Sequence, residues 1–332
     1  MSRLAVIGAG SWGTGLAITL APRFDSISLW VHDSARAAEI TRVRENSLYL
    51  PGFSLPDRVQ VSNDLTTVVS DSDIALFVVP SRYLRNVLTQ ASPFISRQTL
   101  LVSATKGIEQ ETLCRMSQVM AEVVGRPPMS GIAVLSGPTF AREVVAGEPT
   151  AVVIASETAK TAEQIQRAFS TSKLRLYAST DVIGVELGAA LKNVISIGAG
   201  ICRGLGLGSN SVAALVTRGL AEITRLALAM GGNPRTLSGL AGLGDLVLTA
   251  NGDLSRNRFV GIQLGHGHTL DQILASMSMV AEGVATCRAA HELGHREGVD
   301  LPIINKMFEV LYESKDPRRA ISELMDRPLT TE

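Results

Sequence analysis

The segment Gly8-Ala9-Gly10-Ser11-Trp12-Gly13 constrains the fold of this chain more than any other. It follows the apolar run Leu4 to Ile7 directly and opens a stretch with helical spacing. In this strand–turn–helix setting a GxGxxG pattern predicts a dinucleotide site, whereas a ligand-free glycine turn is the less favoured interpretation. Gly8 allows a tight turn, Gly10 lets the backbone approach a pyrophosphate, and Gly13 permits close helix–strand packing. No Gly-Lys-Ser/Thr follows, which excludes a Walker A loop.

The hydrophobic pattern predicts two domains, as the length of 332 residues also suggests. Short β-branched runs alternate with amphipathic stretches up to about residue 180, which predicts a parallel sheet with helical crossovers. The expected strands are 4–7, 28–31, 74–79, 99–103, 132–135, 151–155 and 174–177. Helical spacing then takes over, notably at 181–202, 210–230 and 281–297. We therefore expect an α/β Rossmann-like dinucleotide-binding domain at 1–180 and an all-α substrate domain at 181–332, with the binding site in the cleft between them.

Composition excludes several functional classes. The 31 basic and 31 acidic residues cancel, so no broad field attracts nucleic acid or an anionic membrane. The N-terminus lacks the apolar core of a signal peptide, and charged residues interrupt the apolar segment 182–207. The three cysteines form no CxxC pair, which is typical of reduced thiols, and we interpret them as core or helix residues. They are Cys114, Cys202 and Cys287. We expect a soluble, cytoplasmic protein.

No metal site is predicted. His266 and His268 flank a glycine, but no further Cys, His or carboxylate stands at ligand spacing. The glycine-rich stretch 198–208 lies within or after a predicted helix, where it indicates helix packing or a hinge.

The end of the second predicted strand bears on cofactor choice. An NAD-specific site carries an acidic residue there, about 20 residues after the fingerprint, to bind the ribose hydroxyls. Asp33 stands at this position, although capping of the next helix is the slightly favoured interpretation. His32 and Arg36 could instead meet a 2′-phosphate. The cofactor is therefore expected to be NADPH or NADH, with the choice open.

Residues that follow other predicted strands are further candidates, because ligands bind at the carboxyl ends of the strands of such sheets. Lys106, between Thr105 and Gly107, is expected to contact an anion or a carbonyl group in preference to bulk solvent. The segment Ser136-Gly137-Pro138-Thr139 follows another predicted strand.

Lys192 is the one lysine between Lys173 and Lys306, and it stands in an apolar helical segment beside Asn193. Burial would lower the pKa of its amine toward the range of a general acid or base. The equally weighted alternative is that the side chain reaches solvent from a helix end.

Two further candidate sites for polar contacts stand in the helical half of the sequence. The segment 253–258 offers Ser255, Arg256, Asn257 and Arg258, a combination suited to phosphate recognition, against the alternative of a solvated loop. Asp245, a lone carboxylate in an apolar stretch, could support a lysine, bind a substrate hydroxyl or cap a helix.

Taken together, these segments resemble the bacterial NAD(P)-dependent glycerol-3-phosphate dehydrogenase family along nearly the whole chain. The matching segments, in order, are Gly8–Gly13, Ala104–Gly107, Ser136–Ala141, Leu191–Val194, Ala241–Leu246, Ser255–Arg258 and Val280–Gly283. Single segments among these occur in other dehydrogenases, whereas the full set in this order is specific.

The resemblance implies a role for each matching position. Lys192 would be the proton donor and acceptor. The cofactor would contact Gly8, Gly10, Ser11, Trp12, Gly13, His32, Lys106, Ala141, Arg256, Val280 and Glu282. The substrate would contact Lys106, Gly137, Thr139, Lys192, Asp245, Ser255, Arg256 and Asn257. The implied reaction is reversible hydride transfer between NAD(P)H and dihydroxyacetone phosphate to give glycerol 3-phosphate for phospholipid synthesis.

Two departures from the family pattern limit how far the family's residue roles can be transferred to this chain. Gly15 replaces a frequent alanine, and His32 replaces a frequent arginine, which leaves the choice of cofactor open. Two rival functions remain: a two-domain dehydrogenase of similar layout that acts on a hydroxy acid or a sugar acid phosphate, and a catalytically silent NADPH-sensing or scaffold protein that retains the nucleotide fold. Partners other than small molecules are not expected, except a second copy of the chain through the glycine-rich helices at 181–230.

Overall fold

A computed structural model of the chain describes residues 2–125, 131–277 and 279–329. Two compact units emerge from its internal contacts: Met1–Lys106 with Cys114–Val185, and Gly107–Leu113 with Glu186–Glu332. The short segment 107–113 therefore belongs with the second half of the chain, which the sequence did not indicate. The predicted domain boundary at residue 180 stays a prediction.

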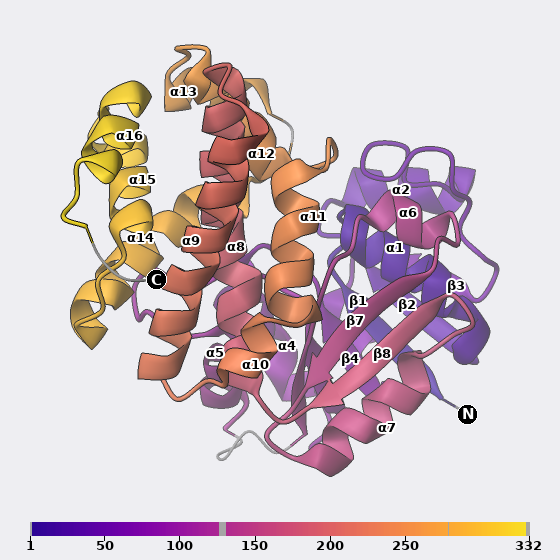
Figure 1. Ribbon diagram of the computed structural model, residues 1–332. Coiled ribbons are helices and arrows are strands. Elements are labelled where there is room, and N and C mark those ends of the chain that lie inside the picture. Colours follow the sequence, from indigo (N-terminus) through magenta and orange to yellow (C-terminus); the bar gives the residue numbers. More distant parts are fainter. Residues whose placement is uncertain (1, 126–130, 278, 330–332) are drawn as a thin grey trace. The chain divides into compact units, whose positions relative to one another are not determined.

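The first unit is built on an eight-stranded sheet with the order β3-β2-β1-β4-β5-β6-β7-β8 (Figure 1). The strands are β1 (Arg3–Ile7), β2 (Ser26–Trp30), β3 (Val59–Ser62), β4 (Ile74–Phe77), β5 (Leu100–Ser103), β6 (Ile132–Ser136), β7 (Thr150–Ala155) and β8 (Leu174–Ser179). All seven predicted strands overlap an observed one, whereas β3 was missed. Its four residues are too few for a distinct alternating pattern.

The expectation of a parallel sheet is wrong at one pair, because β7 runs antiparallel to β6. The connection between them holds only the five-residue helix α6 (Ala141–Val145). A helix of that length rises about 7.5 Å, less than half the length of the strands it joins. It therefore cannot carry the chain back along the sheet, and α6 packs on α1 instead.

The switch in strand order lies between β1 and β4. The right-handed crossovers typical of such sheets place α1 (Ser11–Leu20) and α2 (Ser34–Val43) on one face and α4 (Ser81–Ala91) and α5 (Met116–Val124) on the other. Two further helices, α3 (Leu65–Val69) and α7 (Ala159–Phe169), complete the unit. Dinucleotides bind at such a switch point, directly beyond the β1 end.

The second unit contains α8 (Val182–Gly204), α9 (Ser209–Ala229), α10 (Pro234–Leu237), a π-helical turn (Leu240–Gly244), α11 (Asp245–Asn251), α12 (Arg256–Gly265), α13 (Leu270–Ser276), α14 (Glu282–Glu297), α15 (Pro302–Tyr312) and α16 (Pro317–Met325). The three long helices predicted from sequence are α8, α9 and α14. Helix α8 is long and apolar enough to cross a membrane, but 94% of its most apolar window is buried in the structure. Such burial is typical of a core helix.

Helices α8 and α12 cross with their backbones nearly in contact. A Cβ atom added to Gly261 would lie 1.9 Å from the Ile197 carbonyl oxygen, and one added to Gly200 would lie 2.1 Å from that of Arg258. Glycine at these positions fixes how closely the start of α12 approaches α8. Gly200 belongs to the glycine-rich stretch for which we predicted helix packing or a hinge, and packing is its role.

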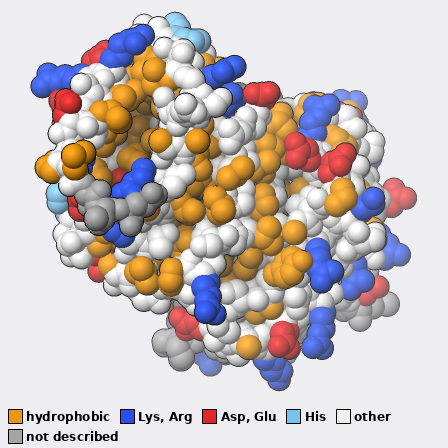
Figure 2. All heavy atoms as spheres, viewed as in Figure 1, with side chains coloured by type: hydrophobic (Ala, Val, Ile, Leu, Met, Phe, Trp, Pro, Cys, Tyr) orange, Lys and Arg blue, Asp and Glu red, His pale blue; other side chains and the backbone are white. Residues whose placement is uncertain are grey.

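Acidic and basic side chains are interspersed on the face of the molecule in Figure 2, as expected for a chain with zero net charge. Cys202 on α8 and Cys287 on α14 are buried, which raises the pKa of both thiols. Cys114 differs from our expectation, because it precedes α5 and is only partly buried.

Glu222 on α9 caps the first turn of α15. Its carboxylate accepts hydrogen bonds from the backbone N–H groups of Ile303 at 2.7 Å and Ile304 at 3.1 Å. The side chain is nonetheless deeply buried, and burial raises the pKa of the Glu222 carboxyl from 4.5 to about 7. The folded state therefore holds the Glu222 proton to higher pH than the unfolded state does.

A carboxyl whose pKa is raised by folding contributes stability at low pH that is lost as the pH rises through its folded value. We expect this group to lower the free energy of unfolding by on the order of 2 kcal/mol between about pH 4.5 and about pH 7. Urea unfolding followed by circular dichroism across this range should show a smaller decline for Glu222→Gln than for wild type. The exposed control Glu157→Gln should follow wild type. Parallel curves for wild type and Glu222→Gln would contradict the assignment.

Candidate functional site

The glycine-rich loop has the geometry that its sequence predicts. Gly8 has a φ of +116°, a conformation that other residues rarely adopt. A Cβ atom on Gly13 would lie 1.8 Å from the Gly8 carbonyl oxygen, so glycine is needed there for α1 to approach the loop. The predicted turn and packing roles are confirmed for these two glycines.

Gly10 differs from them, because its φ of −72° is ordinary and nothing lies within 4 Å of an added Cβ atom. It is the N-cap of α1, and no side chain caps this helix end. No acidic residue stands in the first turn. The N-terminus of α1 therefore offers backbone N–H groups and the positive end of the helix dipole to an anion.

Three residues at the end of β2 are candidates for contact with the cofactor ribose. Asp33 caps α2, since its carboxylate accepts a hydrogen bond from the Arg36 N–H at 2.7 Å, as we expected. The Arg36 guanidinium lies 4.9 Å from the centre of the Tyr49 ring. His32 is exposed, with its ring edge-on to Trp30.

Lys106, Gly137 and Thr139 come together beyond the ends of β5 and β6. The Lys106 ammonium donates to the Gly137 carbonyl at 3.3 Å, and its expected contact with a ligand stays a prediction. The Thr139 hydroxyl donates to the same oxygen at 3.1 Å. Ala141 begins α6, which lies so close to α1 that a Cβ atom on Gly15 would be 3.4 Å from that of Ala141. The nearest atom to this Cβ would be a Val145 methyl carbon at 3.3 Å, so an alanine at position 15, as in the family pattern, would require only a small shift of that side chain.

Lys192 is buried in the middle of α8, with 5% of its surface exposed, so the alternative of a solvent-reaching side chain is wrong. Its ammonium forms a hydrogen-bonded ion pair with Asp245 and donates to the Thr249 hydroxyl at 2.6 Å. Asp245 is 1% exposed and begins α11 directly after the π-helical turn. Of the three roles considered for Asp245, contact with a lysine is observed, and contact with the substrate stays a prediction.

Close backbone approach makes this pairing feasible. A Cβ atom on Gly188, one turn before Lys192, would lie 2.7 Å from the Ala241 carbonyl oxygen in the π-helical turn. Glycine there lets α8 lie against the turn from which Asp245 emerges. The carboxylate stabilises the charged amine, which burial alone would destabilise.

A second buried polar chain runs beside the first. The Asn257 amide donates to the Asn193 side-chain oxygen at 2.9 Å and accepts from the Gly283 N–H at 2.9 Å. Ser255 is the N-cap of α12, so the predicted segment is a helix start rather than a solvated loop. Its hydroxyl lies 3.3 Å from that of Ser196, which donates to the Thr249 carbonyl at 2.7 Å.

Arg256 and Glu282 interact electrostatically within the second unit. Surrounding protein lowers the pKa of the Arg256 guanidinium, and Glu282 raises it. Because a guanidinium stays protonated in proteins, Arg256 keeps its charge. The residue is exposed by surface area, and both Glu282 and Val280 are partly exposed. Charged groups at this end of α12 and α14 are therefore accessible to a ligand.

Sequence reasoning missed two members of the buried polar group, Thr249 and Ser196. Thr249 stands four residues after Asp245, a spacing that places both side chains on one face of a helix. That spacing was the available signal. Ser196 likewise follows Lys192 by four residues.

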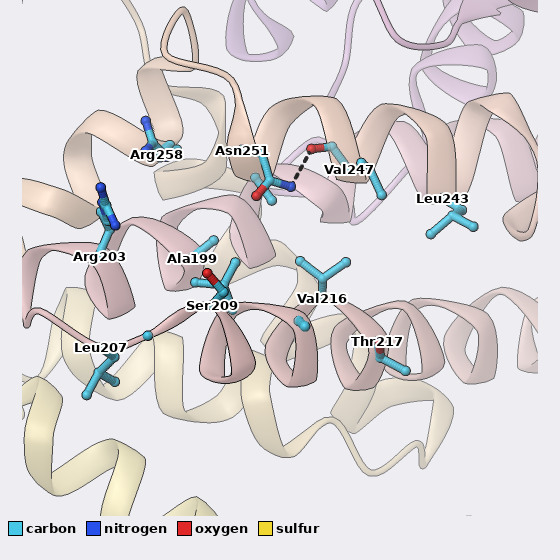
Figure 3. Close-up of a pocket in the computed structure, with 14 residues that line it drawn as sticks. Ala199, Arg203, Leu207, Ser209, Val216, Thr217, Leu243, Val247, Asn251 and Arg258 are labelled. Carbon is cyan, nitrogen blue, oxygen red and sulfur yellow. Dashed lines mark hydrogen bonds between the residues drawn. The ribbon is translucent and has the colours of Figure 1, made fainter.

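A cavity of about 610 Å³ lies in the second unit (Figure 3). Its walls come from α8, α9, α11 and α12, and they include Ala199, Val216, Val247 and Asn251. Helix α11 directs Val247 and Asn251 to this cavity, whereas Asp245 and Thr249 contact Lys192. Arg203 and Arg258 lie at one end (Figure 3). Arg258 is the one residue of the segment predicted for phosphate recognition that appears in the described lining of the cavity.

The two halves of the chain match two family models. Residues 3–162 match the N-terminal model of NAD-dependent glycerol-3-phosphate dehydrogenase, and residues 181–322 match its C-terminal model. A glycerol-3-phosphate dehydrogenase [NAD(P)+] of Geobacter sp. (strain M21) is 51% identical over 330 residues, 99% of this chain and 98% of the relative. That of Koribacter versatilis is 52% identical over 100% of this chain and 99% of its own.

A solved structure extends the comparison. The crystal structure of glycerol-3-phosphate dehydrogenase from Coxiella burnetii has a TM-score of 0.94 at 37% identity and covers 98% of this chain and 99% of its own. Its likeness confirms the predicted fold class of a Rossmann-like unit followed by a helical one. The chain belongs to the NAD(P)-dependent glycerol-3-phosphate dehydrogenase family of oxidoreductases.

Proposed function

We propose that the chain catalyses the reversible reduction of dihydroxyacetone phosphate to glycerol 3-phosphate with NADPH or NADH. The observation that carries the proposal is the buried ion pair of Lys192 with Asp245, in a chain that belongs to this family. A catalytically silent nucleotide-binding protein would have no use for an ammonium held so far from solvent. Reduction adds a hydride to C2 and a proton to its oxygen, so the enzyme needs a proton donor as well as a cofactor.

The residues of the first unit fit a nicotinamide dinucleotide. The uncapped start of α1 suits a pyrophosphate, and the open space beside Gly10 would be filled by a Cβ atom in any other residue. A bound cofactor supplies the hydride. Gly8, Gly10, Ser11, Trp12 and Gly13 would hold its pyrophosphate.

Lys192 has the chemistry required for proton transfer. In the direction of reduction its ammonium gives a proton to the substrate oxygen, and in the reverse direction the neutral amine accepts one. Asp245 and Thr249 fix the amine by hydrogen bonds, which limits the rotamers it can adopt. Arginine could not perform this step, because it does not release its proton.

The phosphate of the substrate requires cationic and polar partners. Arg256, Asn257 and Ser255 stand at the start of α12 and Lys106 stands beyond β5, and these are the residues that we assign to binding. Contacts with the phosphate would supply binding energy that orients the carbonyl group for reaction. Dihydroxyacetone without its phosphate should therefore react much more slowly.

Cofactor choice, location and assembly complete the proposal. Arg36 and His32 stand near the end of β2, where they could contact the 2′-phosphate of NADPH. The acidic candidate for the ribose hydroxyls, Asp33, instead caps α2. Both observations favour NADPH over NADH. Three free cysteines are consistent with a cytoplasmic location. Assembly as a homodimer is supported by exposed apolar surface on α9, such as Leu228 at 51%, whereas α8 is buried.

Replacing Lys192 tests the reaction and its proton donor together. We expect Lys192→Met to lower kcat/KM for dihydroxyacetone phosphate by about 100-fold or more, the usual contribution of a general acid. The affinity for NADPH should remain within about twofold, because Lys192 does not lie in the dinucleotide unit. NADPH oxidation and fluorescence titration measure the two quantities.

The exposed Lys160→Met is the matched control and should behave as wild type. Because loss of Lys192 leaves the Asp245 carboxylate buried without its cation, thermal unfolding must show that the variant is folded. A folded Lys192 variant with more than about a tenth of wild-type kcat/KM would reject the assignment, since general acids contribute far more than this. Failure of wild type to oxidise either cofactor would reject the reaction.

The Gly10→Ala variant distinguishes the effect of this glycine on cofactor affinity from its effect on stability. Nothing surrounds the added methyl group in the protein, so we expect a loss of stability below about 1 kcal/mol. The methyl group would nevertheless occupy the space assigned to the pyrophosphate and should weaken NADPH binding about tenfold or more. Thermal unfolding and NADPH titration measure the two effects. Unchanged affinity in Gly10→Ala would show that the pyrophosphate binds elsewhere.

A further inference from the structure

Asn46, which no motif identified, ties the glycine-rich loop to the segment that follows α2. The side chain is 1% exposed. Its amide nitrogen donates to the Ala9 carbonyl at 2.8 Å and to the Thr14 hydroxyl at 2.8 Å. Because the Ala9 carbonyl can only accept, the atom that faces it must be the nitrogen, which fixes the orientation of the amide. One side chain thus joins the middle of the loop to the first turns of α1.

The segment around Asn46 makes a second contact with the same loop. The Ser11 hydroxyl donates to the Tyr49 carbonyl at 2.6 Å, and the Tyr49 N–H donates to the Asn46 carbonyl at 3.2 Å. Asn46 and Tyr49 therefore form one structural unit that holds both Ala9 and Ser11.

Arg44 anchors this segment to the rest of the first unit. Its backbone is left-handed, with a φ of +54°, where it terminates α2. Its guanidinium donates to three backbone carbonyls, those of Leu55, Pro56 and Val59. Contacts within the first unit therefore hold the segment that carries Asn46, and no ligand is needed to place it.

We propose that Asn46 is a positioning residue of the cofactor site, which holds the glycine-rich loop in the conformation that presents the N-terminus of α1 to the cofactor pyrophosphate. The inference rests on the proposed function only in that a dinucleotide is the ligand. The Asn46 amide holds the Ala9 carbonyl, in the middle of this loop, from outside the loop itself. The loop contains three glycines and would sample many conformations without this contact.

The geometry explains why an amide is required at position 46. The Ala9 carbonyl and the Thr14 hydroxyl both accept a hydrogen bond from the side-chain nitrogen of Asn46, which carries two hydrogens. Aspartate has nearly the same shape but no donor, so it would oppose the Ala9 carbonyl with an oxygen. Alanine would leave the partly buried Ala9 carbonyl without this partner.

Substitution of Asn46 by Asp and by Ala tests the proposal on the full-length chain. If part of the free energy of these hydrogen bonds is lost from the bound conformation, the dissociation constant of NADPH should rise about tenfold. The KM for NADPH should rise in parallel. At saturating NADPH, kcat and the KM for dihydroxyacetone phosphate should stay within about threefold of wild type, because the chemistry is unchanged.

Thr99→Val is the matched control for general destabilisation. Thr99 is 2% exposed and donates a buried hydrogen bond to the Ser72 carbonyl at 2.7 Å. It precedes β5, at the edge of the sheet opposite to the carboxyl ends of the strands. The control should lose stability without any change in the dissociation constant of NADPH. A folded Asn46 variant that binds NADPH as tightly as wild type, or a control that binds it equally weakly, would overturn the proposal.

A second pair of variants decides the matter if neither Asn46 variant folds. Thr14→Val removes one acceptor of the Asn46 amide, whereas Thr14→Ser retains it. We expect the valine variant alone to raise the dissociation constant of NADPH, and equal values in the two variants would overturn the proposal. Binding of NADPH by wild type without reduction of the ketone would reject the proposed reaction and still allow this comparison. Binding of neither NADPH nor NADH by wild type would overturn both.

Discussion

The ion pair between Lys192 and Asp245 is the interaction on which the helical unit depends. An ammonium taken out of water is costly unless a carboxylate and hydrogen-bond acceptors replace its hydration. Asp245 and Thr249 do so, and both lie on α11. This requirement fixes the distance between α8 and α11. It accounts for Gly188, at which α8 approaches the π-helical turn, and for a turn of rare geometry directly before Asp245.

Backbone contact between helices extends the same constraint to α12. The α8–α12 crossing at Gly200 and Gly261 sets the position of the first turn of α12 relative to Lys192. Asn257 then reaches Asn193, the residue next to Lys192, and Gly283 reaches Asn257. Residues from four helices, among them those that we propose for acid/base catalysis and substrate binding, are thus positioned by buried hydrogen bonds and by glycines that allow close backbone approach. A rigid arrangement of this kind suits proton transfer, which is sensitive to small displacements.

Sequence reasoning could predict the features that local patterns encode. The strand–turn–helix setting of Gly8 to Gly13 gave the fold of the first unit, and the isolation of Lys192 in an apolar helix indicated its importance. It could not predict β3, whose pattern is short, or the direction of β7, which depends on where α6 packs. The roles of Asn46 and Thr249 could not be predicted from the sequence for a related reason. Asparagine and threonine are common in loops and helices, and only the folded chain brings them to Ala9 and Lys192.

The central claim is that Lys192 and Asp245 act as one unit in proton transfer, and a double-mutant cycle tests it most directly. The quantity to measure is kcat/KM for dihydroxyacetone phosphate at saturating NADPH in Lys192→Met, Asp245→Asn and the double variant. If the two residues act together, the double variant should fall within about tenfold of the more damaged single variant, because the second change removes nothing further. Independent losses that multiply in the double variant would contradict the account.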